Sequence, residues 1–170
     1  QLVAALAEAG VRAAGISGVD GWLVEADLLR PELGHVGRPA RCNPELLDCL
    51  LAAGFLPVVA CVAGDRAGRI YNVNADQMAA ACAAGFRADR LIFLTDVEGV
   101  LDASRRPLPL LTLDGSQELI RQGVAAGGMQ AKLNAAGEAL RQGVGRVVIA
   151  PGAACGVIAR LLGGEELGTS

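Results

Sequence analysis

Aromatic residues are scarce in this sequence, and their scarcity limits the kind of core that it can build. Only 3% of the 170 residues are Phe, Trp or Tyr, whereas 52% are hydrophobic. The interior must therefore be filled by Ala, Val, Leu and Ile, which is typical of parallel sheets covered by helices. A chain of this length can form one compact α/β domain or two small lobes that share a core.

A large excess of charge of one sign and long apolar runs are also missing. The net charge is −3 with both signs interspersed, which gives no basic surface for nucleic acid and no polybasic segment for a membrane. No apolar run reaches the roughly 18 residues of a membrane span, and the first residues do not resemble a signal peptide. We therefore expect a cytoplasmic protein without a nucleic-acid or membrane partner.

Histidine is almost absent, and the cysteines do not cluster in the sequence. His35 is the only histidine, and none of the five cysteines forms a CxxC pair. This spacing does not predict a metal site, and an odd number of dispersed cysteines favours reduced structural thiols over disulfides.

Short apolar segments alternate with helical patterns along the chain. Strands are predicted at 11–16, 22–26, 56–62, 91–94 and 147–149, and helices at 2–9, 45–53, 75–84, 129–142 and 157–162, with another helix after Asp114 and a flap at 34–37. This alternation predicts an α/β fold with an open, mainly parallel sheet sandwiched by helices. In such a fold, ligands bind beyond the carboxyl ends of the strands.

The opening residues have the pattern of a helix interior. Leu2, Val3, Leu6 and Ala9 repeat at helical spacing directly after Gln1. We therefore expect the chain to be a segment of a longer polypeptide.

Two amides and a carboxylate lie between a predicted strand and the helix that follows it. Asn74 and Asp76 could simply cap this helix and complement its dipole. Asn72 has no such structural necessity, and its amide could donate to a carboxylate or carbonyl of a substrate. From the residues alone, capping and function are equally well supported.

A polar loop, Thr95 to Gly99, follows the most apolar strand. It could be an ordinary turn, or a place where a nucleotide meets backbone amides and a carboxylate. Neither a Walker A sequence nor GxGxxG occurs in the chain.

Lys132 follows two glycines at the start of a predicted helix. We expect Gly127 and Gly128 to form a loop, and Lys132 to lie on the first helical turn, where the helix dipole disfavours a cation. The lysine could be solvated, or it could be placed to meet a phosphate, because helix N-termini bind anions.

Four segments occur in an order that resembles the amino acid kinase superfamily and, within it, the acetylglutamate kinases. They read LGHVG at 33–37, YNVNAD at 71–76, LTDVEGVLD at 94–102 and GGMQAK at 127–132. NVNAD discriminates best, since the uridylate, aspartate, glutamate and carbamate kinase branches read differently there, whereas GGM…K is shared more loosely. The resemblance spans nearly the whole chain.

The resemblance implies an ATP- and Mg²⁺-dependent kinase that phosphorylates the side-chain carboxylate of N-acetyl-L-glutamate in arginine biosynthesis. It implies that residues 1–88 complete the acceptor lobe, that 89–170 form the nucleotide-binding lobe, and that the protein is a homo-oligomer. It makes Asp76 and Lys132 catalytic, and Asn72 and Asn74 substrate-binding. The residues implied to bind nucleotide are Asp96, Val97, Glu98, Gly99, Val100, Leu101, Val124, Ala125 and Ala126.

Two departures from the family pattern leave alternatives open. Ala126 stands where the family commonly has Ser or Thr, and the glycine-rich loops and the lysine expected before Gln1 are absent from this sequence. One alternative is a related kinase for an aminoadipate derivative. The other is a catalytically inactive amino acid kinase domain with a regulatory role.

Overall fold

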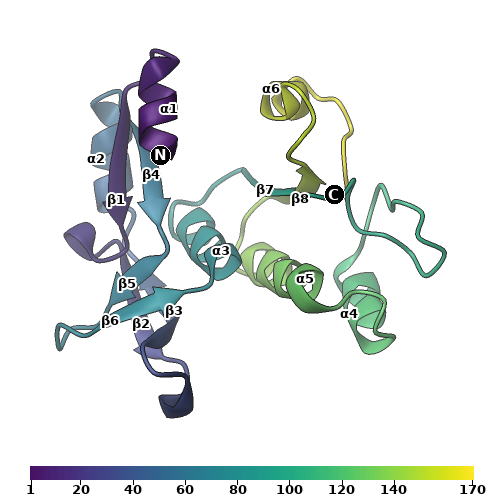
Figure 1. Ribbon diagram of the computed structural model, residues 1–170, viewed down its shortest axis with the longest axis horizontal. Coiled ribbons are helices and arrows are strands. Elements are labelled where there is room, and N and C mark those ends of the chain that lie inside the picture. The colour runs from purple at the N-terminus through teal and green to yellow at the C-terminus, as the bar shows by residue number, and fades with distance from the viewer. The chain divides into compact units, whose positions relative to one another are not determined.

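Two compact units make up the chain. The computed structural model describes all residues, Gln1–Ser170, and divides them into Gln1–Arg87 and Ala88–Ser170 (Figure 1). The division falls close to the boundary predicted from the sequence, whereas what each unit binds stays a prediction.

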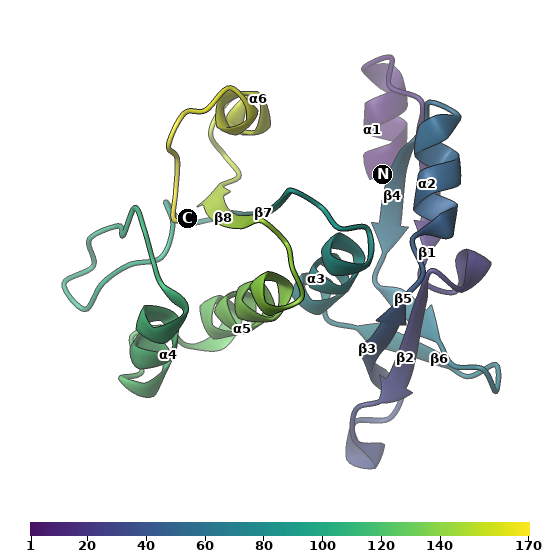
Figure 2. The ribbon, with the colours of Figure 1, turned by 180° about the vertical axis from the view of Figure 1, so that it is seen from behind.

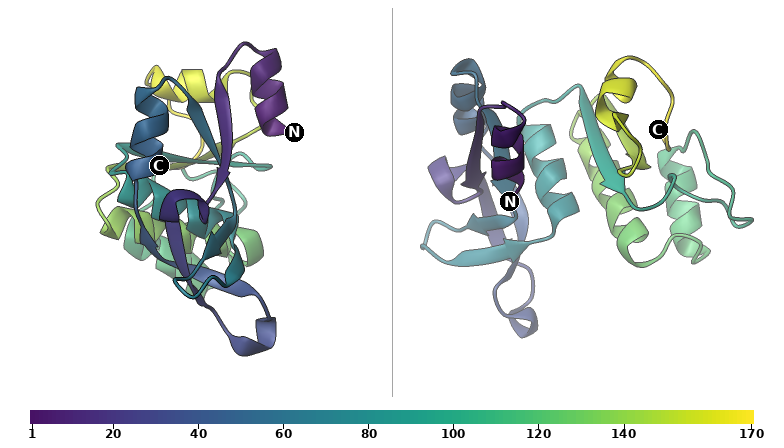
Figure 3. Two further views of the ribbon diagram at one scale, coloured as in Figure 1. Left: turned by 90° about the vertical axis from the view of Figure 1, so that its left-hand side faces the viewer. Right: turned by 45° about the horizontal axis from the view of Figure 1, so that its top comes forward.

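The first unit contains a two-stranded parallel sheet flanked by helices. Strand β1 (Ala13–Ser17) pairs with β4 (Leu56–Ala60), with Ala13 opposite Leu56. Helix α1 (Leu2–Glu8) packs on β1, and α2 (Glu45–Ala52) packs on β4 (Figure 3). The parallel pairing and the two helices agree with the alternation in the sequence.

Four further strands of this unit close into a small barrel. β2 (Val24–Leu28) and β3 (Val36–Cys42) run antiparallel, as do β5 (Val62–Gly64) and β6 (Ile70–Val73). Parallel pairs β3–β6 and β2–β5 complete the ring. Helix α3 (Ala75–Gly85) packs against β3 (Figure 2). The buried core residues here are Leu23, Val24, Ala26, Leu47, Ala63, Tyr71, Val73 and Met78.

Tertiary pairing shortens or divides two of the predicted strands. The apolar run 56–62 separates at Cys61 into β4 and β5, which belong to different sheets, because Cys61 and Val62 pair with new neighbours. The Cys61 carbonyl accepts from the Val73 amide (2.9 Å), and the Val62 carbonyl accepts from the Gly18 amide (2.7 Å). The second predicted strand starts later than expected, because Trp22 lies in a short 3-10 helix, η1 (Asp20–Trp22).

A single carboxylate organises the turn between β5 and β6. Asp65 accepts hydrogen bonds from the backbone amides of Ala67 (2.9 Å) and Arg69 (3.0 Å), from Arg69 Nε (2.6 Å) and from the Tyr71 hydroxyl (2.9 Å). Desolvation alone would raise the pKa of Asp65, but these bonds outweigh it and lower the pKa to about 2. The turn therefore delivers β6 in a fixed position.

The second unit is built around two parallel strands. β7 (Arg90–Thr95) pairs with β8 (Arg146–Pro151) in register, so both strands end at the same edge. Between them in the chain come α4 (Leu113–Arg121) and α5 (Gly127–Arg141), and α6 (Val157–Leu162) follows β8. Figure 1 shows α5 and α6 on opposite sides of the strand pair.

Strand β8 is buried on both faces by these helices. Val148 and Ala150 pack with Val157 and Leu161 of α6, whereas their neighbour Val147, on the other face, lies near α5. Alternate residues of a strand point to opposite faces, so a strand covered on both sides is apolar throughout. The predicted α/β class with helix-covered parallel strands is confirmed. None of the helices combines the length and the hydrophobicity that a membrane span requires.

Candidate functional site

Asn74 is the N-cap of α3. Its Oδ1 accepts hydrogen bonds from the backbone amides of Asp76 (3.0 Å) and Gln77 (3.2 Å), which satisfies two amides that the helix leaves without an internal partner. The capping interpretation of Asn74 is therefore confirmed. Asp76 lies half-buried in the first turn, where a carboxylate complements the helix dipole.

Asn72 lies on β6 beside the predicted flap. Tyr71 and Val73 point into the core, so the intervening Asn72 side chain is exposed. Asn72 pairs with Val36 of β3, and its backbone amide donates to the His35 carbonyl (2.8 Å). The structure thus brings the LGHVG and YNVNAD segments together within the first unit.

The close approach of these two strands depends on a glycine. A Cβ on Gly37 would lie 2.7 Å from the Cβ of Tyr71 and 3.2 Å from that of Ala26. No larger residue fits there without movement of the strand, so close packing of the two strands requires a glycine at position 37.

The second predicted site loop begins at the carboxyl end of β7. Asp96, Val97 and Glu98 are exposed, whereas Gly99 and Val100 are buried, Val100 to 1% exposure. The loop is thus open to a ligand in its first half and packed in its second. Its far side continues into a turn at Asp102, whose pKa is lowered by hydrogen bonds from the Arg106 backbone and side chain.

The GGM element starts a helix and is not a loop, which corrects the sequence prediction. Helix α5 begins at Gly127, with Ala126 as an N-cap that has extended dihedral angles but no capping side chain. Lys132 consequently lies in the second turn, where the helix dipole disfavours a cation less than in the first. The electrostatic argument for Lys132 is weaker than the sequence indicated.

The start of α5 nevertheless has properties that suit an anion. Its first amides receive no side-chain cap, and a Cβ on Gly127 or Gly128 would meet nothing within 4 Å. Open space therefore adjoins a helix N-terminus, which attracts negative charge. The half-buried Lys132 has its Nζ 5.6 Å from the centroid of the Phe93 ring, near the end of β7. The second unit thus places the GGM…K element beside the strand that leads into the Asp96 loop.

The remaining predicted nucleotide residues precede α5. The Val124 and Ala125 amides both donate to the Leu119 carbonyl at the end of α4 (3.0 and 3.1 Å), and Ala125 is buried. Ala126 is exposed. This segment is thus held in place up to Ala125.

No cage for a metal ion is formed by the chain. No group of three or more His, Cys, Asp or Glu side chains is close enough to hold one. Mg²⁺ commonly binds through one or two carboxylates together with phosphate oxygens and does not need such a cage.

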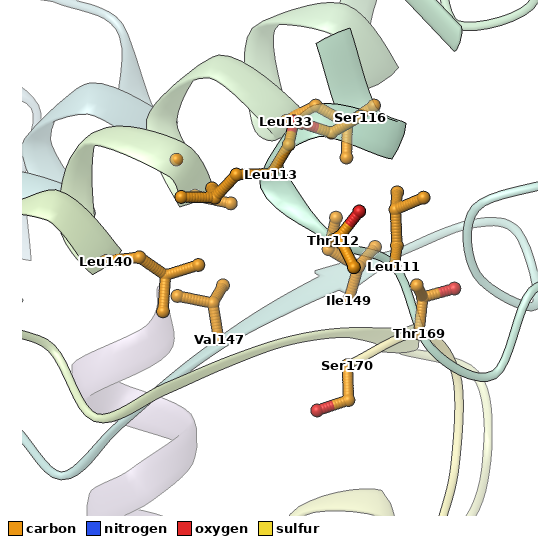
Figure 4. Close-up of a pocket in the computed structure, with 12 residues that line it drawn as sticks. Leu111, Thr112, Leu113, Ser116, Leu133, Leu140, Val147, Ile149, Thr169 and Ser170 are labelled. Atoms are coloured by element: carbon orange, nitrogen blue, oxygen red, sulfur yellow. Dashed lines mark hydrogen bonds between the residues drawn. The ribbon is translucent and has the colours of Figure 1, made fainter. Parts of the chain in front are cut away.

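A cavity in the second unit is lined by residues other than the predicted site residues. Its volume is about 40 Å³, and it is lined mainly by apolar side chains between α4, α5, β8 and the last two residues (Figure 4). Leu113, Leu133, Leu140 and Val147 border it, and no residue predicted to bind substrate or nucleotide does.

Sequence comparison identifies the family. Residues 1–151 match the model of the Amino acid kinase family. The chain belongs to this family. It is 62% identical over 169 residues to an acetylglutamate kinase of Solibacter usitatus, covering 99% of this chain and the C-terminal 66% of that protein. It is 44% identical to an acetylglutamate kinase of Acidobacterium capsulatum, covering 98% of this chain and 66% of that protein. The chain therefore spans just under two thirds of these relatives.

Solved structures of other proteins have the same architecture. The protein smu.665 of Streptococcus mutans superposes with a TM-score of 0.82 at 32% identity, over 88% of this chain and 61% of that one. An N-acetylglutamate synthase of Neisseria gonorrhoeae, solved with coenzyme A and N-acetyl-glutamate, superposes with a TM-score of 0.82 at 25% identity, over 98% of this chain and 39% of that one. The amino acid kinase fold is thereby confirmed.

One structural contributor to the loop region was missed by sequence reasoning. Thr169 is buried to 3% exposure and hydrogen-bonds to Val100 of the Asp96 loop. The only local signal was the glycine before it, Gly168, whose φ of 75° favours glycine.

Proposed function

We propose that this chain forms the larger part of an ATP-dependent acetylglutamate kinase, which transfers the γ-phosphate to the side-chain carboxylate of N-acetyl-L-glutamate. The pairing of the motifs carries the proposal. LGHVG and YNVNAD lie on adjacent strands of one unit, and the GGM…K element adjoins the strand before the Asp96 loop in the other. The 62% identity to a protein named acetylglutamate kinase supports the same function.

The first unit is proposed to hold the acceptor. The exposed amide of Asn72 can donate to a substrate carboxylate. Asn74 shares this surface, but its Oδ1 is used in capping, so only its side-chain NH₂ remains to contact substrate. Asp76, in the first turn of α3, would organise the positive groups that surround the transferring phosphate.

The second unit is proposed to hold the nucleotide. Backbone amides of the exposed half of the 96–101 loop would contact it, with Val124 to Ala126 lining the same site. The uncapped start of α5 would receive phosphate oxygens, and Lys132 would stabilise the charge that develops during transfer. Mg²⁺ would neutralise further phosphate charge and would arrive bound to ATP.

No general base is required for this reaction. A carboxylate acceptor has a pKa of about 4, so it is already ionised at neutral pH. The difficulty is the approach of two anions, and catalysis then depends on positioning and positive charge. In the proposal, Asn72 helps to position the acceptor and Lys132 supplies positive charge. Cytoplasmic location, homo-oligomer formation and a role in arginine biosynthesis stay predictions that follow from the proposed activity.

A coupled kinase assay tests the proposal on the complete polypeptide that contains these residues. Turnover with N-acetylglutamate should exceed turnover with N-acetylaminoadipate, and the reverse order would favour the aminoadipate kinase. Asp76→Asn and Lys132→Ala should each reduce kcat with little change in melting temperature. For Lys132→Ala, the reduction should correspond to a loss of about 3 kcal/mol of transition-state stabilisation. Absence of turnover with either acceptor would favour the inactive regulatory domain.

The chain Gln1–Ser170 gives a second test by itself. We expect it to bind MgATP weakly and not to phosphorylate acetylglutamate, because one third of the relatives' length has no counterpart in it. Calorimetric titration with MgATP measures the first property and the coupled assay the second. Robust phosphorylation by this chain would show that the unmatched third of the relatives contributes no necessary group.

A further inference from the structure

Thr169 joins three segments of the second unit that are far apart in the sequence. Its backbone pairs with β8, because its amide donates to the Ile149 carbonyl and its carbonyl accepts from the Ile149 amide, both at 2.8 Å. The side chain is 3% exposed. A hydroxyl that is buried to this degree needs hydrogen-bond partners.

The hydroxyl finds both partners in the segment that contains the candidate nucleotide loop. Oγ1 accepts from the Val100 amide (2.8 Å) and donates to the Leu108 carbonyl (2.6 Å). The Val100 carbonyl in turn accepts from the Leu108 amide (2.8 Å). The amide and the carbonyl of Val100 are therefore both fixed, one of them by the Thr169 side chain alone.

Glycines on both sides allow this close approach. A Cβ on Gly99, which has φ of 152°, would lie 2.8 Å from Thr169 Oγ1. A Cβ on Gly168 would lie 2.0 Å from the Ile149 carbonyl oxygen. Contacts this short do not occur in folded proteins, so each glycine is required for Thr169 to reach the loop.

Figure 4 shows the orientation of the side chain. The oxygen of Thr169 is turned away from Leu140 and Val147, which border the apolar cavity. The hydroxyl therefore hydrogen-bonds to the loop segment and does not point toward these two residues of the cavity.

The loop is held at its other end by β7. The Thr95 carbonyl accepts from the Gly152 amide (2.7 Å), beyond the last paired residues of the two strands. Between this point and Val100 lie the exposed residues Asp96 to Glu98, whose amides are proposed to meet the nucleotide. With Thr169 present, this short segment is fixed at both ends.

We propose that Thr169 is a positioning residue of the nucleotide site, whose hydroxyl holds Val100 and so pre-organises the loop for MgATP. The inference rests on the proposed function, since it needs the loop to bind nucleotide. Without the hydroxyl, the Val100 amide loses its buried acceptor and the loop populates other conformations. If the competent conformation falls to about one tenth, the dissociation constant for MgATP rises about tenfold.

Three variants of Gln1–Ser170 test this inference. Thr169→Val keeps the shape and removes the hydroxyl, Thr169→Ser keeps the hydroxyl, and Ser170→Ala is the matched control at the adjacent residue, whose hydroxyl accepts from Arg146 Nε. The dissociation constant for MgATP should rise about tenfold for the valine variant and should stay within about twofold for the other two. Equal affinity of the valine variant and the unaltered chain would overturn the inference while leaving the proposed function intact.

Amide hydrogen exchange measured by NMR separates positioning from general stability. In the unaltered chain without nucleotide, Val100 should exchange slowly and the exposed Glu98 quickly. The valine variant should lose protection at Val100 while amides of β8 keep theirs. Fast exchange at Val100 in the unaltered chain would overturn the inference even if the valine variant fails to fold. If the unaltered chain binds no MgATP at all, the proposed nucleotide site fails, and the inference fails with it.

Discussion

The two asparagines before α3 offer the clearest separation of capping from binding. Asn74→Ala removes the oxygen that accepts from the Asp76 and Gln77 amides at 3.0 and 3.2 Å. Loss of such a cap costs about 1 kcal/mol, within a range of about 0.5–2. For a unit of the size of Gln1–Arg87, a loss of 1 kcal/mol lowers the melting temperature by about 4–8 °C.

Two further variants assign the remaining effects. Asn74→Asp keeps a good capping oxygen and adds favourable charge at the helix start, so stability should be retained. The same change replaces the side-chain amide by a carboxylate, which should weaken binding of an anionic acceptor. Asn72→Ala alters an exposed side chain, so the free energy of unfolding should change by less than about 0.5 kcal/mol while KM for acetylglutamate rises.

Far-UV circular dichroism during heating and urea titration measures the stability of each variant. The coupled kinase assay on the complete polypeptide measures KM. The reasoning is refuted if Asn74→Ala melts like the unaltered protein, or if Asn74→Asp is destabilised as much as Asn74→Ala. Unchanged KM in Asn72→Ala would remove Asn72 from the acceptor site.

Three other changes test separate features. Asp65→Asn should destabilise the protein at neutral pH relative to the control Glu32→Gln, as measured by urea titration. Because the pKa of Asp65 in the folded protein is lowered to about 2, the difference in free energy of unfolding between the two variants should shrink as the pH falls from about 4 toward 2. Ala126→Ser adds a capping hydroxyl at extended dihedral angles and should raise the free energy of unfolding by about 1 kcal/mol; no gain would show that this position cannot cap α5. Gly99→Ala should lower the free energy of unfolding by about 1–3 kcal/mol. Removal of Thr169 Oγ1 in the same chain should restore only part of this free energy, because the backbone strain at φ 152° remains.

Local sequence signals predicted the elements whose formation depends mainly on neighbouring residues. Asn74 followed by a small-residue helix gave the start of α3 correctly, since a capping side chain acts within three residues. The apolar runs around Phe93 and Val148 gave β7 and β8 correctly, and β8, which is covered on both faces, is apolar from Val147 to Ala150. The motif order also led to the family, which the comparison confirms.

Other features were decided only by the tertiary structure. The run from Leu56 to Val62 reads as one strand, yet Cys61 separates it because Val73 and Gly18 offer pairing partners that no local pattern reveals. The glycines before Lys132 carry a turn signal locally, but α5 begins at the first of them.

The anchor at Thr169 depends most strongly on the tertiary structure. Thr169 and Val100 are 69 residues apart in the chain, and nothing in either local sequence specifies that a hydroxyl at one meets an amide at the other. Propensity and periodicity act over a few residues, whereas a buried hydrogen bond between distant segments exists only once β8 and the loop are packed together. The sequence alone therefore determined the family and most of the elements, and tertiary packing determined how the candidate nucleotide loop is held.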